Sequence, residues 1–146
     1  MDFEDFEESA EQELKRADHL LYVTLKYTRT AEVIKNTIKR LVNAYDFGAL
    51  EALHALKFKN IPDVPRQRMK ILGGEMPQFK KEVDFYILMK NIDAASFKAK
   101  DEYRKNVTLL TDVENVNAPK LEDYFKRTVE FIRVIRELVE TKGKKK

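Results

Sequence analysis

The chain of 146 residues has no cysteine and no tryptophan, and its only histidines are His19 and His54. The absence of cysteine excludes disulfide bonds, thiolate zinc sites and a cysteine nucleophile. Two histidines leave too few imidazoles for a multi-histidine metal centre. No apolar run reaches the length of about 18 residues that a transmembrane helix needs. We therefore predict no metal, no cofactor and no membrane partner for this chain.

The first residues are acidic, whereas a signal peptide begins with basic and then apolar residues, so we expect a cytoplasmic protein. The length predicts one domain, and charged residues, mainly lysine and glutamate, make up 36% of the chain. That composition is typical of proteins from thermophiles. We place the domain at residues 1–141 and predict a disordered lysine tail at 142–146.

The net charge of +3 conceals a strong segregation along the chain. Residues 1–13 carry seven acids and no base, and the last five residues carry four bases and no acid. Within the body, basic residues cluster at 26–40 and 57–81. Such clusters form an electrostatic footprint for RNA or DNA if they converge on one face. The alternative is that they are solvated helix faces, neutralised by acids elsewhere in the fold.

The spacing of apolar residues predicts helices through most of the chain. Prolines 62 and 65 mark a linker, and the Gly73-Gly74 pair is expected to end a short helix. Residues 99–118 have β-branched residues in partial alternation, which predicts a hairpin around Asp112 or an irregular loop. The expected helices span about 3–27, 31–57, 66–72, 77–97 and 117–141.

We therefore predict an all-α, up-and-down bundle of four long helices plus a short helix, with an irregular or small β-hairpin insertion before the last helix. Thr28 or Thr30 is expected to cap the second helix. Gly48 lies near the apolar stripe of that helix and would allow another helix to come close. Val33, Phe47 and Leu50 lie off the stripe and indicate a second apolar contact, which favours self-association as a dimer.

Two positions invite a chemical interpretation. Asp84 stands in an otherwise apolar stretch, and a buried carboxylate needs a partner. Asp84 could make a structural contact with Arg104, Arg40 or a tyrosine hydroxyl, or it could be a carboxylate with a perturbed pKa in a cleft. Glu51 and His54 have the Glu-x-x-His spacing of di-iron helices, but they fall on the side opposite the apolar stripe, so we expect them to face solvent. We predict no catalytic residue.

Tyr103 is followed by Arg104 and Lys105 beside the irregular segment. Tyrosine and arginine there could stack on and clamp a nucleotide or RNA strand, or they could simply end a helix. The candidate nucleic-acid-binding residues are Lys26, Arg29, Lys35, Arg40, Arg66, Arg68, Lys70, Tyr103, Arg104 and Lys105.

Residues 20–30, LLYVTLKYTRT, look like a segment of small archaeal helical proteins. Together with the long helices, the proline-bounded connection and the basic clusters, they resemble the HEPN-like helical bundles of prokaryotes. Ribonucleases of that family are similar in carrying an arginine followed four to six residues later by a histidine. Here Arg16 precedes His19 by only three residues, and the last helix has no histidine. The resemblance therefore brings no catalytic residue to this chain.

The leading functional hypothesis from sequence is a non-catalytic helical interaction module that self-associates. The alternative is an RNA- or nucleic-acid-binding helical protein, which could be a degenerate HEPN-like nuclease.

Overall fold

The computed structural model describes residues 9–144 and shows an all-α bundle with one small antiparallel sheet. This confirms the predicted fold class. None of the described helices is both long enough and apolar enough to pass through a membrane. The elements in chain order are α2 (Ala10–His19), the π-helix η1 (Leu20–Thr24), α3 (Leu25–Tyr27), α4 (Ala31–Ala55), α5 (Pro65–Glu75), the 3-10 helix η2 (Pro77–Phe79), α6 (Lys80–Ala94), β1 (Lys98–Lys100), β2 (Thr108–Leu110), β3 (Val116–Asn117) and α7 (Ala118–Lys144).

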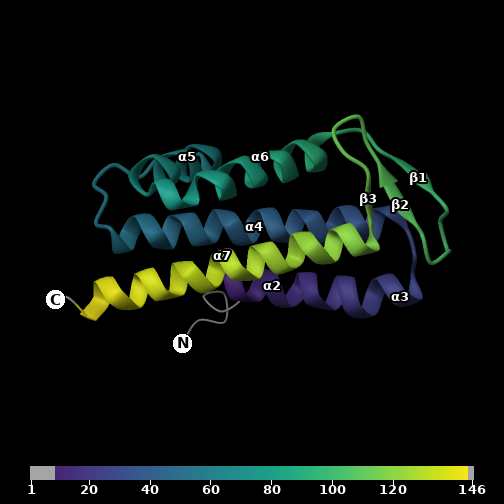
Figure 1. Ribbon diagram of the computed structural model, residues 1–146, viewed down its shortest axis with the longest axis horizontal. Helices are drawn as coiled ribbons and strands as arrows, with labels where there is room; N and C mark the ends of the chain where they lie inside the picture. Colours follow the sequence, from purple (N-terminus) through teal and green to yellow (C-terminus); the bar gives the residue numbers. More distant parts are fainter. Residues whose placement is uncertain (1–8, 145–146) are drawn as a thin grey trace.

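Helix α4 forms the centre of the bundle (Figure 1). Helices α2 and α3 run along one side of α4, α5 and α6 cover the other side, and α7 crosses it. The sequence explains this position, because buried residues recur around most of α4. The sheet lies at one end of the bundle, beside the start of α4.

Helices α4 and α7 pack closely against each other along the core. The rings of Tyr45 and Phe131 stack with their centroids 4.3 Å apart. A Cβ added at Gly48 would lie 2.9 Å from Ile132 Cδ1 and 3.0 Å from Phe131 Cε2. The prediction that Gly48 allows a close helix approach is thus confirmed.

Both ends of α4 are capped by local hydrogen bonds. At the start, the Thr30 hydroxyl oxygen accepts from the Val33 N–H at 3.3 Å, which confirms Thr30 as the cap. At the end, the Phe58 N–H donates to Leu53 O and the Lys57 N–H donates to His54 O. These two bonds form a Schellman motif, in which Lys57 adopts a left-handed conformation with φ of 58°.

We predict that Lys57→Gly raises the free energy of unfolding by about 0.5–1 kcal/mol. A side chain destabilises the left-handed conformation by about 1–2 kcal/mol, and the greater freedom of glycine in the unfolded chain offsets part of the gain. Urea unfolding of the two proteins measures the difference. Lys59→Gly is the control, and a gain of equal size there would contradict the conformational explanation.

Helix α5 passes through both glycines and ends at Glu75, so the expected stop at Gly73-Gly74 is wrong. A Cβ at Gly73 would lie 2.6 Å from Val83 Cγ2, so this glycine permits the packing of α5 against α6. The helix ends two residues before Pro77, because a proline forces the preceding residue, here Met76, out of the helical region. Met76 accordingly has φ of −130° and ψ of 91°.

The predicted hairpin around Asp112 is present, and it forms between β2 and β3 with Leu109 opposite Val116. Strand β1 extends it to three antiparallel strands, with Ala99 opposite Leu109. Leu109 and Val116 are buried, and β2 contacts α4. The hairpin is therefore anchored in the core, which fixes the position of the turns that it carries.

Arg136 on α7 forms ion pairs with Glu11 on α2 and Glu51 on α4. This ion triad joins three helices. Glu51 therefore faces solvent only in part, with its side chain 31% exposed, whereas His54 is exposed as expected. Sequence spacing within one helix could not reveal the partner, because Arg136 lies 85 residues from Glu51.

The C-terminal end of the chain differs from the prediction. Helix α7 continues to Lys144, so the first part of the tail predicted to be disordered at 142–146 is helical. Lysine is a good helix former, and positive charge is favourable at a helix C-terminus. Residues 145–146 and the acidic residues 2–8 lie outside the described residues.

Candidate nucleic-acid interface

Segments far apart in the sequence meet at the sheet end of the bundle, at the right of Figure 1. They are η1 with α3, the turn at 101–107 between β1 and β2, and the start of α7. Two hydrogen bonds hold the turn against the linker before α4. The Tyr103 N–H donates to Arg29 O at 2.6 Å, and Glu102 Oε2 accepts from the Ala31 N–H at 3.0 Å.

The backbone is unusual on both sides of this junction. Asp101 and Tyr103 have φ of 55° and 67°, in the left-handed region that non-glycine residues seldom occupy. Across the junction, helical hydrogen bonding switches to the π pattern over Leu20–Thr24. Backbone strain and π-turns both concentrate at functional sites. The backbone conformation alone therefore marks this end of the molecule as a candidate functional site.

A cavity of about 650 Å³ lies between these segments. Much of its wall is apolar, and basic residues from α3, the linker and the turn lie around it. Burial raises the pKa of the Tyr22 hydroxyl in this wall, and the Glu122 carboxylate adds to the shift, so Tyr22 stays neutral. The lining of the cavity includes the apolar residues Leu21, Leu25 and Val107 and the basic residues Lys26, Arg29 and Lys105.

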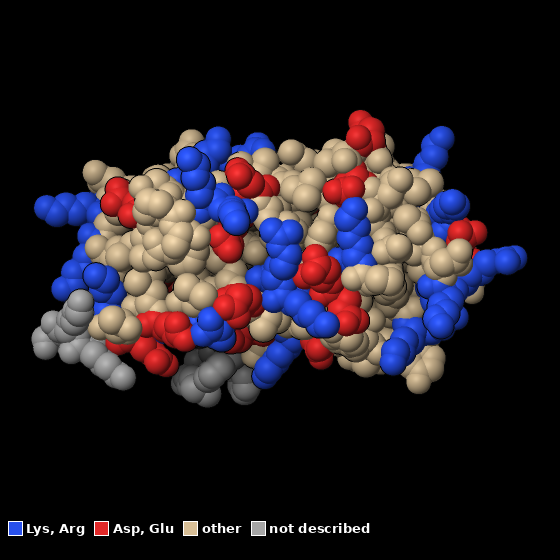
Figure 2. All heavy atoms as spheres, in the orientation of Figure 1, with Lys and Arg blue, Asp and Glu red and all other residues tan. Residues whose placement is uncertain are grey.

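Two tyrosines are strongly exposed next to the cavity. Tyr27 is 86% exposed at the end of α3, and Tyr103 is 76% exposed on the turn. Strand β1 adds Lys98 and Lys100, which are exposed. In Figure 2, lysine and arginine side chains gather at this end of the molecule. We call the following residues the hairpin-end surface: Lys26, Tyr27, Arg29, Lys98, Lys100, Tyr103, Arg104 and Lys105.

The structure brings together half of the residues proposed from sequence. Lys26, Arg29, Tyr103, Arg104 and Lys105 all belong to the hairpin-end surface. Tyr27 was missed although it directly follows Lys26 in the sequence. The signal for Lys98 and Lys100 was weak, because they lie outside the basic clusters and only the fold brings them next to the others.

The remaining candidates lie elsewhere. Lys35 on α4 places its Nζ 5.5 Å from the centroid of the Phe97 ring, beside the sheet. Arg40 is paired with Glu13 on α2. Arg66, Arg68 and Lys70 are on α5. The two basic clusters of the sequence therefore do not form one continuous surface, and 57–81 is separate from the hairpin-end surface.

Asp84 is exposed, so the prediction of a carboxylate in apolar surroundings is wrong. The residues on either side of it, Val83 and Phe85, are both buried, and Asp84 faces away between them. The buried carboxylate is instead Glu13, whose side chain is 6% exposed. Its spacing of three residues from Ala10 and four from Ala17, both fully buried, was the signal that could have identified it.

Glu13 lies beside a second cavity of about 400 Å³ between α2, α4 and α5. Asp46 also lines it and accepts a hydrogen bond from the Tyr86 hydroxyl at 2.6 Å. Burial raises the pKa of Asp46, and the Tyr86 hydrogen bond opposes that shift. Within residues 9–144, no three histidine, aspartate or glutamate side chains converge to form a metal site.

Comparison with known proteins gives no match to a family model, to a curated protein or to a solved structure.

Proposed function

We propose that this protein binds single-stranded nucleic acid, RNA in the first instance, through the hairpin-end surface. The observation that carries the proposal is the convergence of basic side chains and two exposed tyrosines around one largely apolar cavity. Sequence-tolerant binders of single strands combine these features, a positive surface for the backbone and aromatic rings for the bases.

Each component has a separate role. Lys26, Arg29 and Lys105 contact backbone phosphates, which releases counterions and gives affinity that depends on salt. Tyr27 and Tyr103 offer ring faces on which bases stack. The apolar wall of the cavity accepts one unstacked base.

A single strand fits this surface better than a duplex. Reading a duplex requires an exposed helix or ribbon that enters a groove. The basic and aromatic residues of this surface instead surround a cavity whose apolar wall matches a base that is free of a partner strand.

Self-association is a second proposal. Two of the α4 residues that suggested it, Val33 and Phe47, make their contacts within the chain. Val33 is buried within the chain, and Phe47 is packed against the core. Val33 and Phe47 are therefore accounted for by contacts within the chain, whereas Leu50 lines the cavity beside Glu13.

We predict that a fluorescein-labelled, mixed-sequence RNA of about 12 nucleotides binds at low salt, with affinity falling steeply as salt rises. The double variant K26Q/K105Q removes two phosphate contacts and lowers the slope of log K against log salt by about 1.4. Tyr103→Ala removes one stacking ring and weakens binding by about tenfold, with little change in that slope. Fluorescence anisotropy measures both quantities.

The matched control is R66Q/K70Q, which removes the same charge from exposed positions on α5. This control is expected to bind RNA almost as the unmodified protein does. The proposal is overturned if the protein fails to bind at low salt, or if the α5 variant loses as much affinity as K26Q/K105Q. Equal binding of duplex RNA would contradict the single-strand assignment.

A further inference from the structure

We infer that the cavity beside Glu13 is a second binding site, which takes the phosphate group of a small phosphate monoester. We call it the Glu13 pocket and define it by Glu13, Arg16, Arg40, Asn43, Asp46 and Arg68. It shares no residue with the hairpin-end surface, so the inference goes beyond the proposed function.

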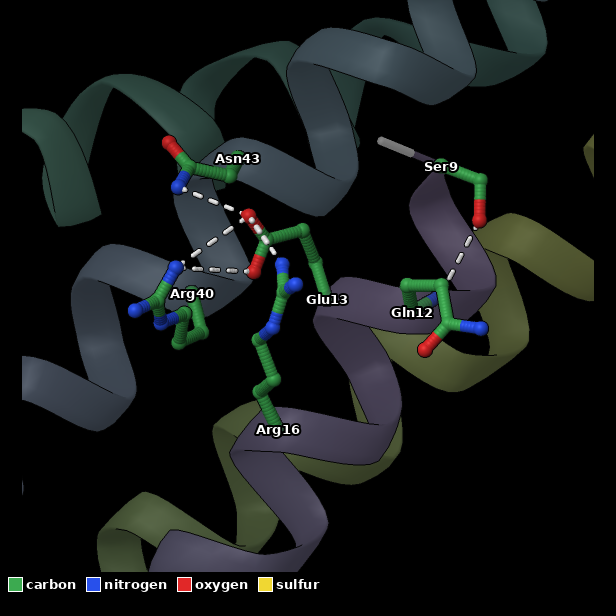
Figure 3. Close-up of polar contacts among 6 residues, drawn as sticks. All are labelled: Ser9, Gln12, Glu13, Arg16, Arg40 and Asn43. Carbon is green, nitrogen blue, oxygen red and sulfur yellow. Dashed lines mark hydrogen bonds and ion pairs between the residues drawn. The ribbon is translucent and has the colours of Figure 1, made fainter. Parts of the chain in front are cut away.

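The pocket contains a prearranged pair of guanidinium groups. Glu13 Oε2 lies 3.3 Å from Arg40 Nη1, and Glu13 Oε1 lies 3.5 Å from Arg16 Nη1 and 3.2 Å from Asn43 Nδ2. Figure 3 shows Arg16, Arg40 and Asn43 pointing toward the Glu13 carboxylate. One carboxylate that is almost fully buried thus holds two cations, and the resulting trio carries a net positive charge.

Both guanidinium groups of this trio reach solvent. The Arg40 and Arg16 side chains are 40% and 38% exposed, against 6% for Glu13. A guanidinium has five N–H donors arranged as a planar fork. The hydrogen bonds from Arg40 to Glu13 use only its Nη1, so its other donors can bind a ligand oxygen.

Arg68 adds a third guanidinium from α5. Its Nε donates to Pro62 O at 2.7 Å and its Nη2 donates to Asp63 O at 3.2 Å. These carbonyl oxygens orient the side chain without neutralising its charge. The guanidinium groups of Arg16, Arg40 and Arg68 thus line one pocket together with the carboxylates of Glu13 and Asp46.

This arrangement selects the ligand by its chemistry. Arginine forks match phosphate oxygens through paired hydrogen bonds, and a carboxylate behind the forks fixes their orientation before binding. Phe47 and Leu50 line the same pocket and offer apolar contacts to the rest of the ligand. The volume of about 400 Å³ suits a molecule no larger than a mononucleotide.

The test is isothermal titration calorimetry of the full chain at low salt with adenosine 5′-monophosphate, inorganic phosphate and adenosine. The two phosphate probes are expected to bind and adenosine is not. Arg68→Gln is expected to weaken binding at least tenfold while it leaves the Glu13 contacts in place. Amide shifts at Glu13, Arg40 and Asn43 in NMR spectra locate the bound phosphate.

Arg40→Gln is expected to weaken binding to a similar degree, and Arg68→Gln keeps the test valid if Arg40→Gln does not fold. Arg66→Gln, an exposed neighbour on α5, and K26Q/K105Q are expected to bind the probes normally. The inference is overturned by failure of both phosphate probes to bind, by equal binding of adenosine, or by retention of affinity in Arg68→Gln. A loss in K26Q/K105Q would move the phosphate site to the hairpin-end surface and would also overturn it.

Discussion

Replacing Phe131 by alanine is expected to lower the free energy of unfolding by about 3–5 kcal/mol. Phe131 is 2% exposed and stacks on Tyr45, with its edge toward Phe79 at a centroid distance of 5.6 Å. Its ring also covers Gly48, where α4 and α7 are closest. The truncation leaves a cavity that these helices cannot close, because their separation is already set by the other core side chains.

Urea unfolding followed by far-UV circular dichroism measures this loss. Val129→Ala, at an exposed position on the same helix, is the control and is expected to change stability by less than about 0.5 kcal/mol. A loss at Phe131 no larger than that of Val129→Ala would show that the α4–α7 contact is not the core of the bundle.

Glu13→Ala is expected to destabilise the protein by about 2–3 kcal/mol. The change removes the acceptor of hydrogen bonds from Arg40 and Asn43, and hydrogen bonds to charged groups are worth more than neutral ones. The loss stays below that of a fully buried ion pair, because Arg40 and Arg16 are partly exposed and water solvates them.

Glu13→Gln tests whether charge or shape matters. Glutamine keeps one acceptor oxygen, but it loses the charge and replaces the second oxygen by an NH2 group that cannot accept from Arg40. We therefore expect at least half of the loss, measured by urea unfolding. Asp18→Ala, at an exposed position on α2, is the control and is expected to stay within about 0.5 kcal/mol of the unmodified protein. Equal effects at Glu13 and Asp18 would contradict the structural role of the buried carboxylate.

The helices were predictable because apolar periodicity is a local property that the core then reinforces. Thr30, Gly48 and the hairpin around Asp112 were found for the same reason, since cap, close approach and turn each have a short-range signature. The end of α5 was predicted too early, because Gly73 allows the helix to pack against Val83 and does not end it. Sequence alone does not separate that role from helix termination.

The sites were only partly predictable. Lys26 and Tyr103 were recognised as basic and aromatic positions, but they meet only because the turn after β1 docks on the linker before α4. The Asp84 error had a different cause, since apolar neighbours in sequence do not imply apolar neighbours in space on a helix. Glu13 was overlooked because acids surround it in the sequence, although its helical position places it on the buried face.

The π-helix determines how α3 is rotated relative to α2 about the axis of the first helical segment. The buried residues Ala17, Leu21 and Leu25 are four apart, and in a regular α-helix each such step would turn the buried face by about 40°. The wider turn at Leu20–Thr24 takes up this drift and keeps the face directed at α4. If this turn were regular α-helix instead, the two steps together would rotate everything beyond it by about 80°, carrying Lys26 and Tyr27 away from the turn at Tyr103. The π-helical turn therefore sets the rotation of Lys26 and Tyr27 relative to α2, and so their position beside the turn at Tyr103.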